Sequence, residues 1–208
     1  CFETLSQLRA SKIAVDCVAL CTPPAVRLAL AREVLDYGWH LLIEKPPTPT
    51  VGELLAMEAY ARKKKRVLYA AWHSRYNKSV DMAKARLKGQ HVNFLKVTWK
   101  EDVRKWHPGQ EWIWQPGGFG VFDPGINALS IVTKILPEPI FADSATIEVP
   151  ANASTPIAAN IRFKRGDGAA ADLSAAFDWR QVTGETWEIE IGTKSGLALH
   201  LKKGGSVL

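Results

Sequence analysis

The chain has few cysteines, no long apolar run and no glycine-rich turn ahead of its first predicted strand. Its three cysteines, Cys1, Cys17 and Cys21, cannot all pair, and no histidine stands at ligand spacing from the last two. The sequence therefore predicts a reduced, cytoplasmic setting and no metal site. No apolar stretch approaches the roughly 20 residues that span a bilayer, so we expect no membrane association. Cys17 and Cys21 lie in or beside an apolar segment, where we expect them to pack as small hydrophobic side chains.

A basic stripe interleaved with aromatic residues is also absent, although the formal net charge is +6. Much of the excess comes from the run Lys63, Lys64, Lys65 and Arg66, which ends a predicted helix, where cations complement the helix dipole. This pattern argues against a nucleic-acid partner. With 208 residues, 47% of them hydrophobic, the chain has ordinary globular composition and room for one large or two modest domains.

The first part of the chain alternates apolar strand-like segments with helical patterns. Strands are predicted at 15–21, 41–44 and 67–72, and helices at 2–10, 26–37 and 51–64. Thr50 is expected to cap the third helix, with Glu53 at the capping-box spacing. Alternating strands and helices predict right-handed crossovers and a parallel α/β sheet covered on both faces.

The pattern changes after residue 74, where we place a domain boundary. Residues 1–74 are predicted to form an α/β domain with a parallel sheet, and residues 75–208 an α+β domain with a large, mostly antiparallel sheet. Helices are expected at 79–87 and 126–135, and strands at 92–100, 140–149, 157–164, 170–179, 186–191 and 197–201. The sequence Gly166-Asp167-Gly168 predicts a hairpin turn.

Two short motifs carry the polar residues of a candidate site. Glu44-Lys45-Pro46 follows an apolar strand, and ligands of open α/β sheets bind outside the carboxyl ends of the strands. Further along, Asp123 and Asn127 are four residues apart and would share one face of a helix. Taken locally, Asp123 is equally expected to be only the N-cap of that helix, with Pro124 at its first position.

This order of elements, with the Glu-Lys-Pro motif and the later segment 117–125, resembles the Gfo/Idh/MocA oxidoreductases. The resemblance implies that residues 1–74 are the C-terminal part of a dinucleotide-binding Rossmann domain and that residues 75–208 are a substrate-binding α+β domain with an open sheet. The longer strings at 97–104, 106–110 and 122–129 are most similar to the bacterial branch that oxidises L-arabinose or D-galactose. This resemblance therefore implies oxidation of the anomeric carbon of an aldose to a lactone, with hydride passing to NAD or NADP.

The resemblance also implies roles for individual residues. Members of the family usually carry histidine four residues after the motif aspartate, where this chain has Asn127, so Asp123 becomes the expected acid/base. Lys45 would donate hydrogen bonds to the reacting oxygen or a neighbouring hydroxyl. The departure at Asn127 weakens an assignment to inositol-type dehydrogenases.

The segment from Glu101 to Gly118 is rich in indole and polar side chains. Sugars have apolar C–H faces and a rim of hydroxyls, so Trp106, His107, Glu101 and Asn127 are candidate sugar-binding residues. A packed loop or a subunit contact would use the same residue types. We favour a ligand for Trp106 and His107, and a structural role for Trp112.

The cofactor-binding candidates stand at strand ends. They are Thr22, Pro23, Glu44, Lys45 and His73. The family's glycine-rich first turn is expected to precede Cys1, which makes the chain an internal piece of a longer protein with weak cofactor binding of its own.

Other functions and partners stay open at this point. A regulator on the same fold that binds sugar or nucleotide without catalysis is one alternative, and a related inositol or diol dehydrogenase is another. Trp179 and Trp187 would lie on a broad face of the C-terminal sheet. That face could bury against a second copy, so we expect a homo-oligomer.

Overall fold

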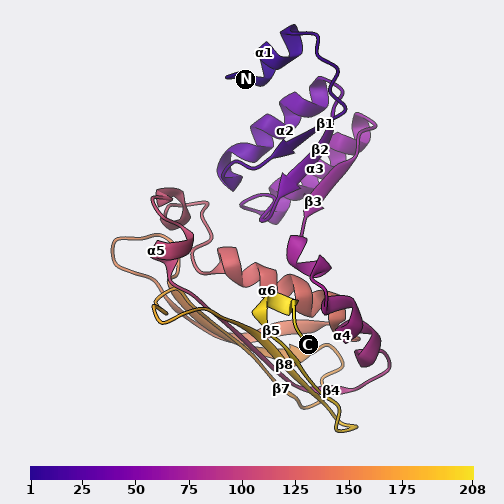
Figure 1. Cartoon of the computed structure of the whole chain (residues 1–208), viewed down its shortest axis with the longest axis vertical. Coiled ribbons are helices and arrows are strands. Elements are labelled where there is room, and N and C mark those ends of the chain that lie inside the picture. The colour runs from indigo at the N-terminus through magenta and orange to yellow at the C-terminus, as the bar shows by residue number, and fades with distance from the viewer. The chain divides into compact units, whose positions relative to one another are not determined.

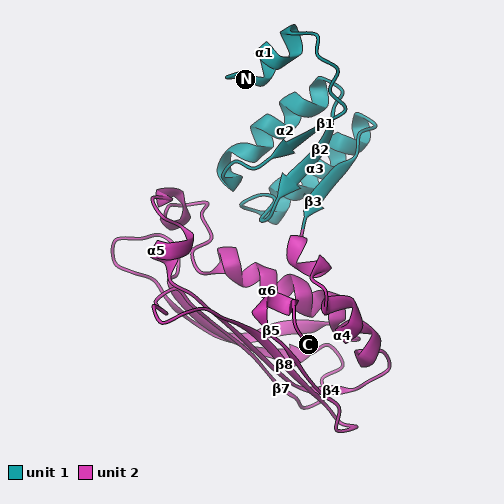
Figure 2. Cartoon of the chain, viewed as in Figure 1, with its two compact units in different colours: residues 1–71 teal, residues 72–208 magenta.

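The computed structural model describes all residues, 1–208, as two compact units (Figure 2). Unit 1 is Cys1–Ala71 and unit 2 is Trp72–Leu208. The boundary between the two units lies close to Ser74, where the sequence pattern changes. No helix in either unit is both long enough and apolar enough to cross a membrane.

Unit 1 is a three-stranded parallel sheet with helices (Figure 1). Its elements are α1 (Leu5–Ala10), β1 (Cys17–Leu20), a 3-10 turn (Pro24–Val26), α2 (Arg27–Asp36), β2 (His40–Glu44), α3 (Val51–Lys63) and β3 (Leu68–Ala71). The Thr50 hydroxyl accepts a hydrogen bond from the Glu53 backbone N–H at 3.2 Å, which confirms the predicted N-cap of α3. The predicted parallel α/β sheet is confirmed.

The helices cover one face of this sheet, so the prediction that both faces are covered is wrong for this chain. The strands lie in the order β1-β2-β3, and successive right-handed crossovers in one direction place α2 and α3 on the same side. That side buries Leu35, Leu41 and Ile43. The opposite face leaves side chains such as Tyr69 exposed.

The cysteines also differ from expectation. All three are free and exposed, including Cys17 and Cys21. The reason is position in the sheet: β1 is an edge strand, Cys17 is on its uncovered face, and Cys21 follows its end.

Unit 2 is a six-stranded mixed sheet in the order β5-β6-β7-β4-β8-β9, in which only β4 and β7 pair in parallel. Its strands are β4 (Val92–Lys100), β5 (Ile140–Glu148), β6 (Ala158–Arg165), β7 (Asp172–Asp178), β8 (Thr186–Thr193) and β9 (Ala198–Leu201). Its helices are α4 (Val80–Leu87), α5 (Val103–Trp106) and α6 (Phe122–Ile135), with 3-10 turns at His73–Tyr76, Glu111–Trp114 and Lys203–Gly205. The predicted, mostly antiparallel open sheet is confirmed.

One face of the large sheet is covered by α4 and α6, and the other is open (Figure 1). Alternation along the strands produces this difference, because Val97, Phe177 and Ile189 point into the core while Lys96 and Glu190 point away from it. The hairpin turn predicted at Gly166-Asp167-Gly168 follows β6, which pairs antiparallel with β7.

Two local predictions need correction. Helix α6 begins at Phe122 and not at Ile126, so its first turn includes Asp123. Its N-cap is Val121, which makes no capping side-chain hydrogen bond, and Asp123 is therefore not the N-cap. The short helix α5 and the following 3-10 turn were not predicted, since segments of four residues carry no periodic signal.

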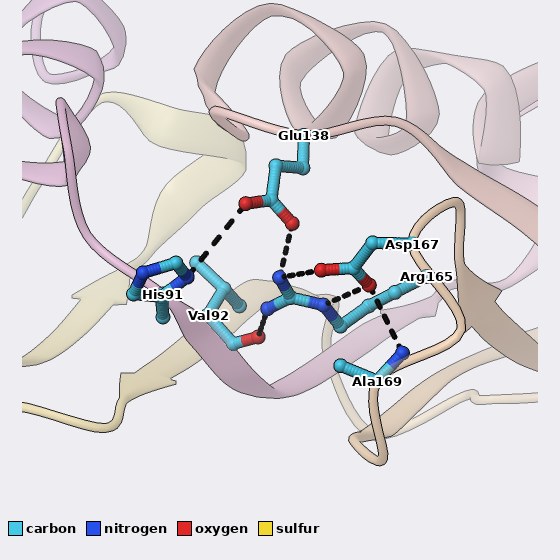
Figure 3. Close-up of polar contacts among 6 residues, drawn as sticks. All are labelled: His91, Val92, Glu138, Arg165, Asp167 and Ala169. Atoms are coloured by element: carbon cyan, nitrogen blue, oxygen red, sulfur yellow. Dashed lines mark hydrogen bonds and ion pairs between the residues drawn. The ribbon is translucent and has the colours of Figure 1, made fainter.

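A buried arginine at the end of β6 ties several segments of unit 2 together (Figure 3). The Arg165 side chain is only 5% exposed, and its Nη1 donates to the carbonyl oxygen of Val92 at 2.5 Å. Its Nε and Nη2 donate to both oxygens of Asp167 at 2.9 and 2.6 Å, and Nη2 also contacts Glu138. One guanidinium therefore contacts three segments: the start of β4, the β6–β7 turn and the α6–β5 connection.

Replacing this arginine should destabilise unit 2. We expect Arg165→Ala to lower the free energy of unfolding by about 2 kcal/mol, because the Val92 carbonyl loses a charged donor while Asp167 and Glu138 still reach solvent. Chemical denaturation measures the change. The control is Arg104→Ala, which removes an exposed guanidinium paired with Asp102 and should change the free energy of unfolding much less. Equal effects of the two variants would contradict this account.

The same cluster predicts a pH dependence. Hydrogen bonds from Arg165 hold the pKa of Asp167 well below its ordinary value of 3.8. A carboxyl with a lowered folded-state pKa stabilises the fold above its unfolded pKa, and this contribution is lost as the pH falls through the folded pKa. We expect Asp167→Asn to lose less stability than the original protein between about pH 5 and about pH 2. Denaturation midpoints across that range test this, and parallel curves would contradict it.

Candidate functional site

The carboxyl ends of β1 and β2 in unit 1 are joined by a buried arginine. Arg27 is 3% exposed, its Nε donates to the Thr22 carbonyl oxygen at 2.7 Å, and its Nη1 donates to the carbonyl oxygens of Glu44 and Pro46. The backbone on both sides of Lys45 is therefore held against the end of β1. Sequence reasoning missed Arg27, because an arginine at a helix start gives no sign that it will be buried.

The predicted cofactor residues of unit 1 lie at these strand ends. Lys45 directly follows β2, its bond to Pro46 is cis, and its backbone N–H donates to the Glu44 carboxylate at 3.2 Å. The Thr22 hydroxyl is buried and has no hydrogen-bond partner. An unpaired hydroxyl at the carboxyl end of a parallel strand, beside Pro23, fits a polar ligand such as a dinucleotide.

His73, the remaining residue predicted to bind the cofactor, lies in unit 2. It begins the 3-10 turn at His73–Tyr76, and its Nδ1 lies 3.3 Å from the Ser74 hydroxyl.

Unit 2 gathers two carboxylates around one imidazole. The Nε2 atom of His107 lies 3.8 Å from Oδ2 of Asp123 and 4.0 Å from Oε1 of Glu101. Asp123 is 4% exposed and Glu101 is 3% exposed, so both acids are buried. The other ring nitrogen, Nδ1 of His107, lies 3.3 Å from the Gln110 amide oxygen. Three of the predicted site residues therefore come together, from the end of β4, the end of α5 and the first turn of α6.

Indole rings surround this group. The Trp187 N–H donates a hydrogen bond to Oε2 of Glu101 at 2.8 Å. The ring centroids of Trp106 and Trp187 lie 5.0 Å apart. The centroid of the Trp179 ring lies 5.2 Å from that of His107 and 5.1 Å from that of Trp114. An apolar wall with a few convergent polar groups is the lining expected of a small-molecule site.

These contacts correct the expectation for Trp179 and Trp187. Trp179 is fully buried in the core of unit 2, and Trp187 is half-buried against Trp99 and Trp106. Neither ring lies on the open face of the sheet, because Trp187 pairs in register with the inward-facing Trp99 and Trp179 lies beyond the end of β7.

The remaining predictions for this segment have separate outcomes. Asn127 is half-buried one turn along α6 from Asp123, and its carbonyl oxygen accepts from the Ser130 hydroxyl at 2.7 Å. Trp112 packs against the core, in agreement with the structural role favoured for it.

A pocket of about 510 Å³ adjoins the cluster of Glu101, His107 and Asp123, and its lining includes His107, Gln110 and Trp114.

Comparison with known proteins gives a consistent set of relatives. A family model described as an oxidoreductase family with an NAD-binding Rossmann fold matches residues 1–72. The chain is 42% identical over 207 residues to galactose 1-dehydrogenase of Pseudomonas fluorescens, covering 100% of this chain and 66% of that protein. It therefore spans slightly less than two thirds of that relative's length.

Solved structures agree. A D-galactose-1-dehydrogenase protein from Rhizobium etli has a TM-score of 0.90 and 46% identity, over 98% of this chain and 65% of that one. GenD2 of gentamicin A biosynthesis, solved with NAD, has a TM-score of 0.81 at 21% identity, over 96% of this chain and 58% of that one, and so shares the fold. With the two units, the motifs and these matches combined, the chain belongs to the Gfo/Idh/MocA oxidoreductase family.

Proposed function

We propose that the full-length protein containing this chain oxidises the anomeric carbon of an aldose, D-galactose or L-arabinose, to its lactone. The observation that carries the proposal is the buried Asp123 carboxylate beside His107 and Glu101, within a wall of tryptophans. The similarity of this chain to galactose 1-dehydrogenase, which extends over its whole length, supports the same activity.

In this reaction a hydride leaves C1 and a proton leaves O1. NAD or NADP, when bound, supplies the hydride acceptor. A carboxylate within hydrogen-bond reach of O1 can accept the proton, which balances the reaction as lactone, reduced cofactor and one proton. Asp123 is the proposed base. Glu101, His107 and Asn127 would bind the sugar hydroxyls, and Trp106 would cover an apolar face of the ring.

Residues of unit 1 are proposed to act on the cofactor and on the reacting oxygen. Lys45 would donate to O1 or a neighbouring hydroxyl and so stabilise developing negative charge. Thr22, Pro23 and Glu44 would contact the dinucleotide, and the unpaired Thr22 hydroxyl supports this assignment.

His73, from unit 2, is proposed to bind near the cofactor as well. We propose no preference between NAD and NADP, and the cytoplasmic location stays a prediction.

A non-catalytic regulator on the same fold is the less favoured alternative. Such a regulator would bind its ligand without a catalytic base, so it would not need the buried Asp123 carboxylate. The relatives with high identity are named as dehydrogenases, which also favours an enzyme.

Changing Asp123 to asparagine tests the proposed base. We expect Asp123→Asn to lower kcat by at least about 100-fold, because a neutral amide of the same shape cannot accept the proton. Cofactor reduction with D-galactose and L-arabinose, followed in full-length protein by the absorbance of reduced nicotinamide, measures the loss.

Asp81→Asn, at an exposed carboxylate paired with Lys134, is the matched control and should retain full activity. Thermal unfolding of both variants verifies folding. Near-normal turnover of folded Asp123→Asn would rule out Asp123 as the base.

We also propose that the open face of the large sheet is the contact between copies of this protein. Charged and polar side chains alternate across it, among them Lys96, Arg162, Glu190 and Asp172. A shallow pocket of about 410 Å³ lies among its small residues, which include Ala176. A face that carries both signs of charge can complement itself around a two-fold axis.

A bulky charge on this face should separate the copies. We expect Ala176→Arg to convert the full-length oligomer to monomer, because the new side chain stands where the two sheets would meet. Sedimentation velocity measures the change, and Ala85→Arg on the exposed side of α4 is the control. A wild-type protein that sediments as a monomer would remove the proposal.

A further inference from the structure

A carboxylate from a distant loop fixes the outermost indole of the candidate site. Oε1 of Glu185 accepts a hydrogen bond from the Trp106 indole N–H at 3.1 Å. The same oxygen forms an ion pair with Nζ of Lys105. Glu185 lies in the connection from β7 to β8, about 80 residues along the chain from α5, so this contact joins two segments that are far apart in the sequence.

Trp106 needs such support. It is 41% exposed and ends a helix of four residues, so little packing holds its ring in one orientation. One side of it meets Trp187, at 5.0 Å and an interplanar angle of 56°. The Lys105 ammonium lies 5.0 Å from the Trp106 ring centroid, in the range of a cation–π contact. Glu185 therefore holds both the N–H of the ring and the cation beside it.

The charge of Glu185 favours this arrangement. Hydrogen bonding from Lys105 lowers the pKa of the Glu185 carboxyl, so it stays ionised and keeps accepting from both partners at neutral pH. A glutamine here could still accept from the indole but would lose the attraction to Lys105. An alanine would lose both contacts.

The chain neighbours of Trp106 connect this contact to the chemistry. His107 is the next residue, and it lies 3.8 Å from Asp123. Trp187, against which Trp106 packs, donates to Glu101. Glu185 thus supports the wall of the cluster without itself contacting Asp123, Glu101 or His107 in any hydrogen bond or ion pair described above.

We propose that Glu185 is a positioning residue for aldose binding, which acts by holding Trp106 in the orientation that receives the apolar face of the sugar. This role rests on the proposed function, because it assigns Glu185 to the same site. A residue of this kind affects how well the sugar binds and has little effect on proton removal by Asp123.

The test is a double-mutant cycle in the full-length protein, assayed with D-galactose. We expect Glu185→Ala to raise KM about tenfold, which corresponds to one indole contact, while kcat changes less than about twofold. Glu185→Gln should give an intermediate KM. Trp106→Ala should raise KM by a similar factor, and adding Glu185→Ala to it should have no further effect, since coupled residues are not additive. Glu58→Ala, at an exposed ion pair with Arg62, is the control.

Each result has a distinct meaning. A KM for Glu185→Ala within about twofold of the original, or the same tenfold increase in the Trp106→Ala background, would overturn the positioning role and leave the proposed function standing. A parallel fall in kcat and thermal stability would show a general structural role and would also overturn it. Absence of aldose oxidation by the unaltered protein would remove the proposed function and this inference together.

Discussion

The burial of two carboxylates beside one imidazole is the constraint on which the rest of unit 2 depends. Removing an ionised carboxylate from water costs several kcal/mol unless hydrogen bonds or charges replace the water. Here the Trp187 indole N–H donates a hydrogen bond to Glu101, and Nε2 of His107 lies within 4.0 Å of a carboxylate oxygen of both acids. These groups come from β4, α5, α6 and β8, so the segments must converge before the acids can be buried. A site this demanding is consistent with a function that needs the acids there.

Glycines allow the segments to approach closely enough. A Cβ on Gly118 would lie 2.5 Å from the Trp112 carbonyl oxygen, and one on Gly120 would lie 2.2 Å from that of Pro156. Gly120 also has a φ of +53°, a conformation that costs other residues energy. The backbone can therefore pass against its neighbours and enter α6 at Phe122. The glycine-rich motif of this segment is explained by close packing as well as by turn geometry, and the position of Asp123 follows from it.

Sequence reasoning found what depends on local pattern and missed what depends on distant contacts. The strand from Val92 to Lys100, the Thr50 cap and the hairpin at Asp167 follow from periodicity and turn chemistry, and all are present. Burial of Arg27, and the inward position of Trp179, depend on strand order and on neighbours far along the chain. Glu101 and His107 were predicted as site residues from the polar, indole-rich segment around them, and Asp123 from its motif and the family resemblance. That the three meet depends on the fold of unit 2.

Strand β4 connects the stability of unit 2 to its chemistry. Its first residue, Val92, is held by Arg165, and Glu101 directly follows its last residue, Lys100. Because side chains alternate along a strand, a slip of one residue in its pairing with β7 or β8 would turn its inward face outward and displace Glu101 from the Trp187 N–H. The buried arginine at one end thus helps to fix the register on which the buried acid at the other end depends. Loss of Arg165 should reach the site only through unfolding or slippage of the whole strand, since no direct contact joins Arg165 to Glu101 among the hydrogen bonds and ion pairs described here.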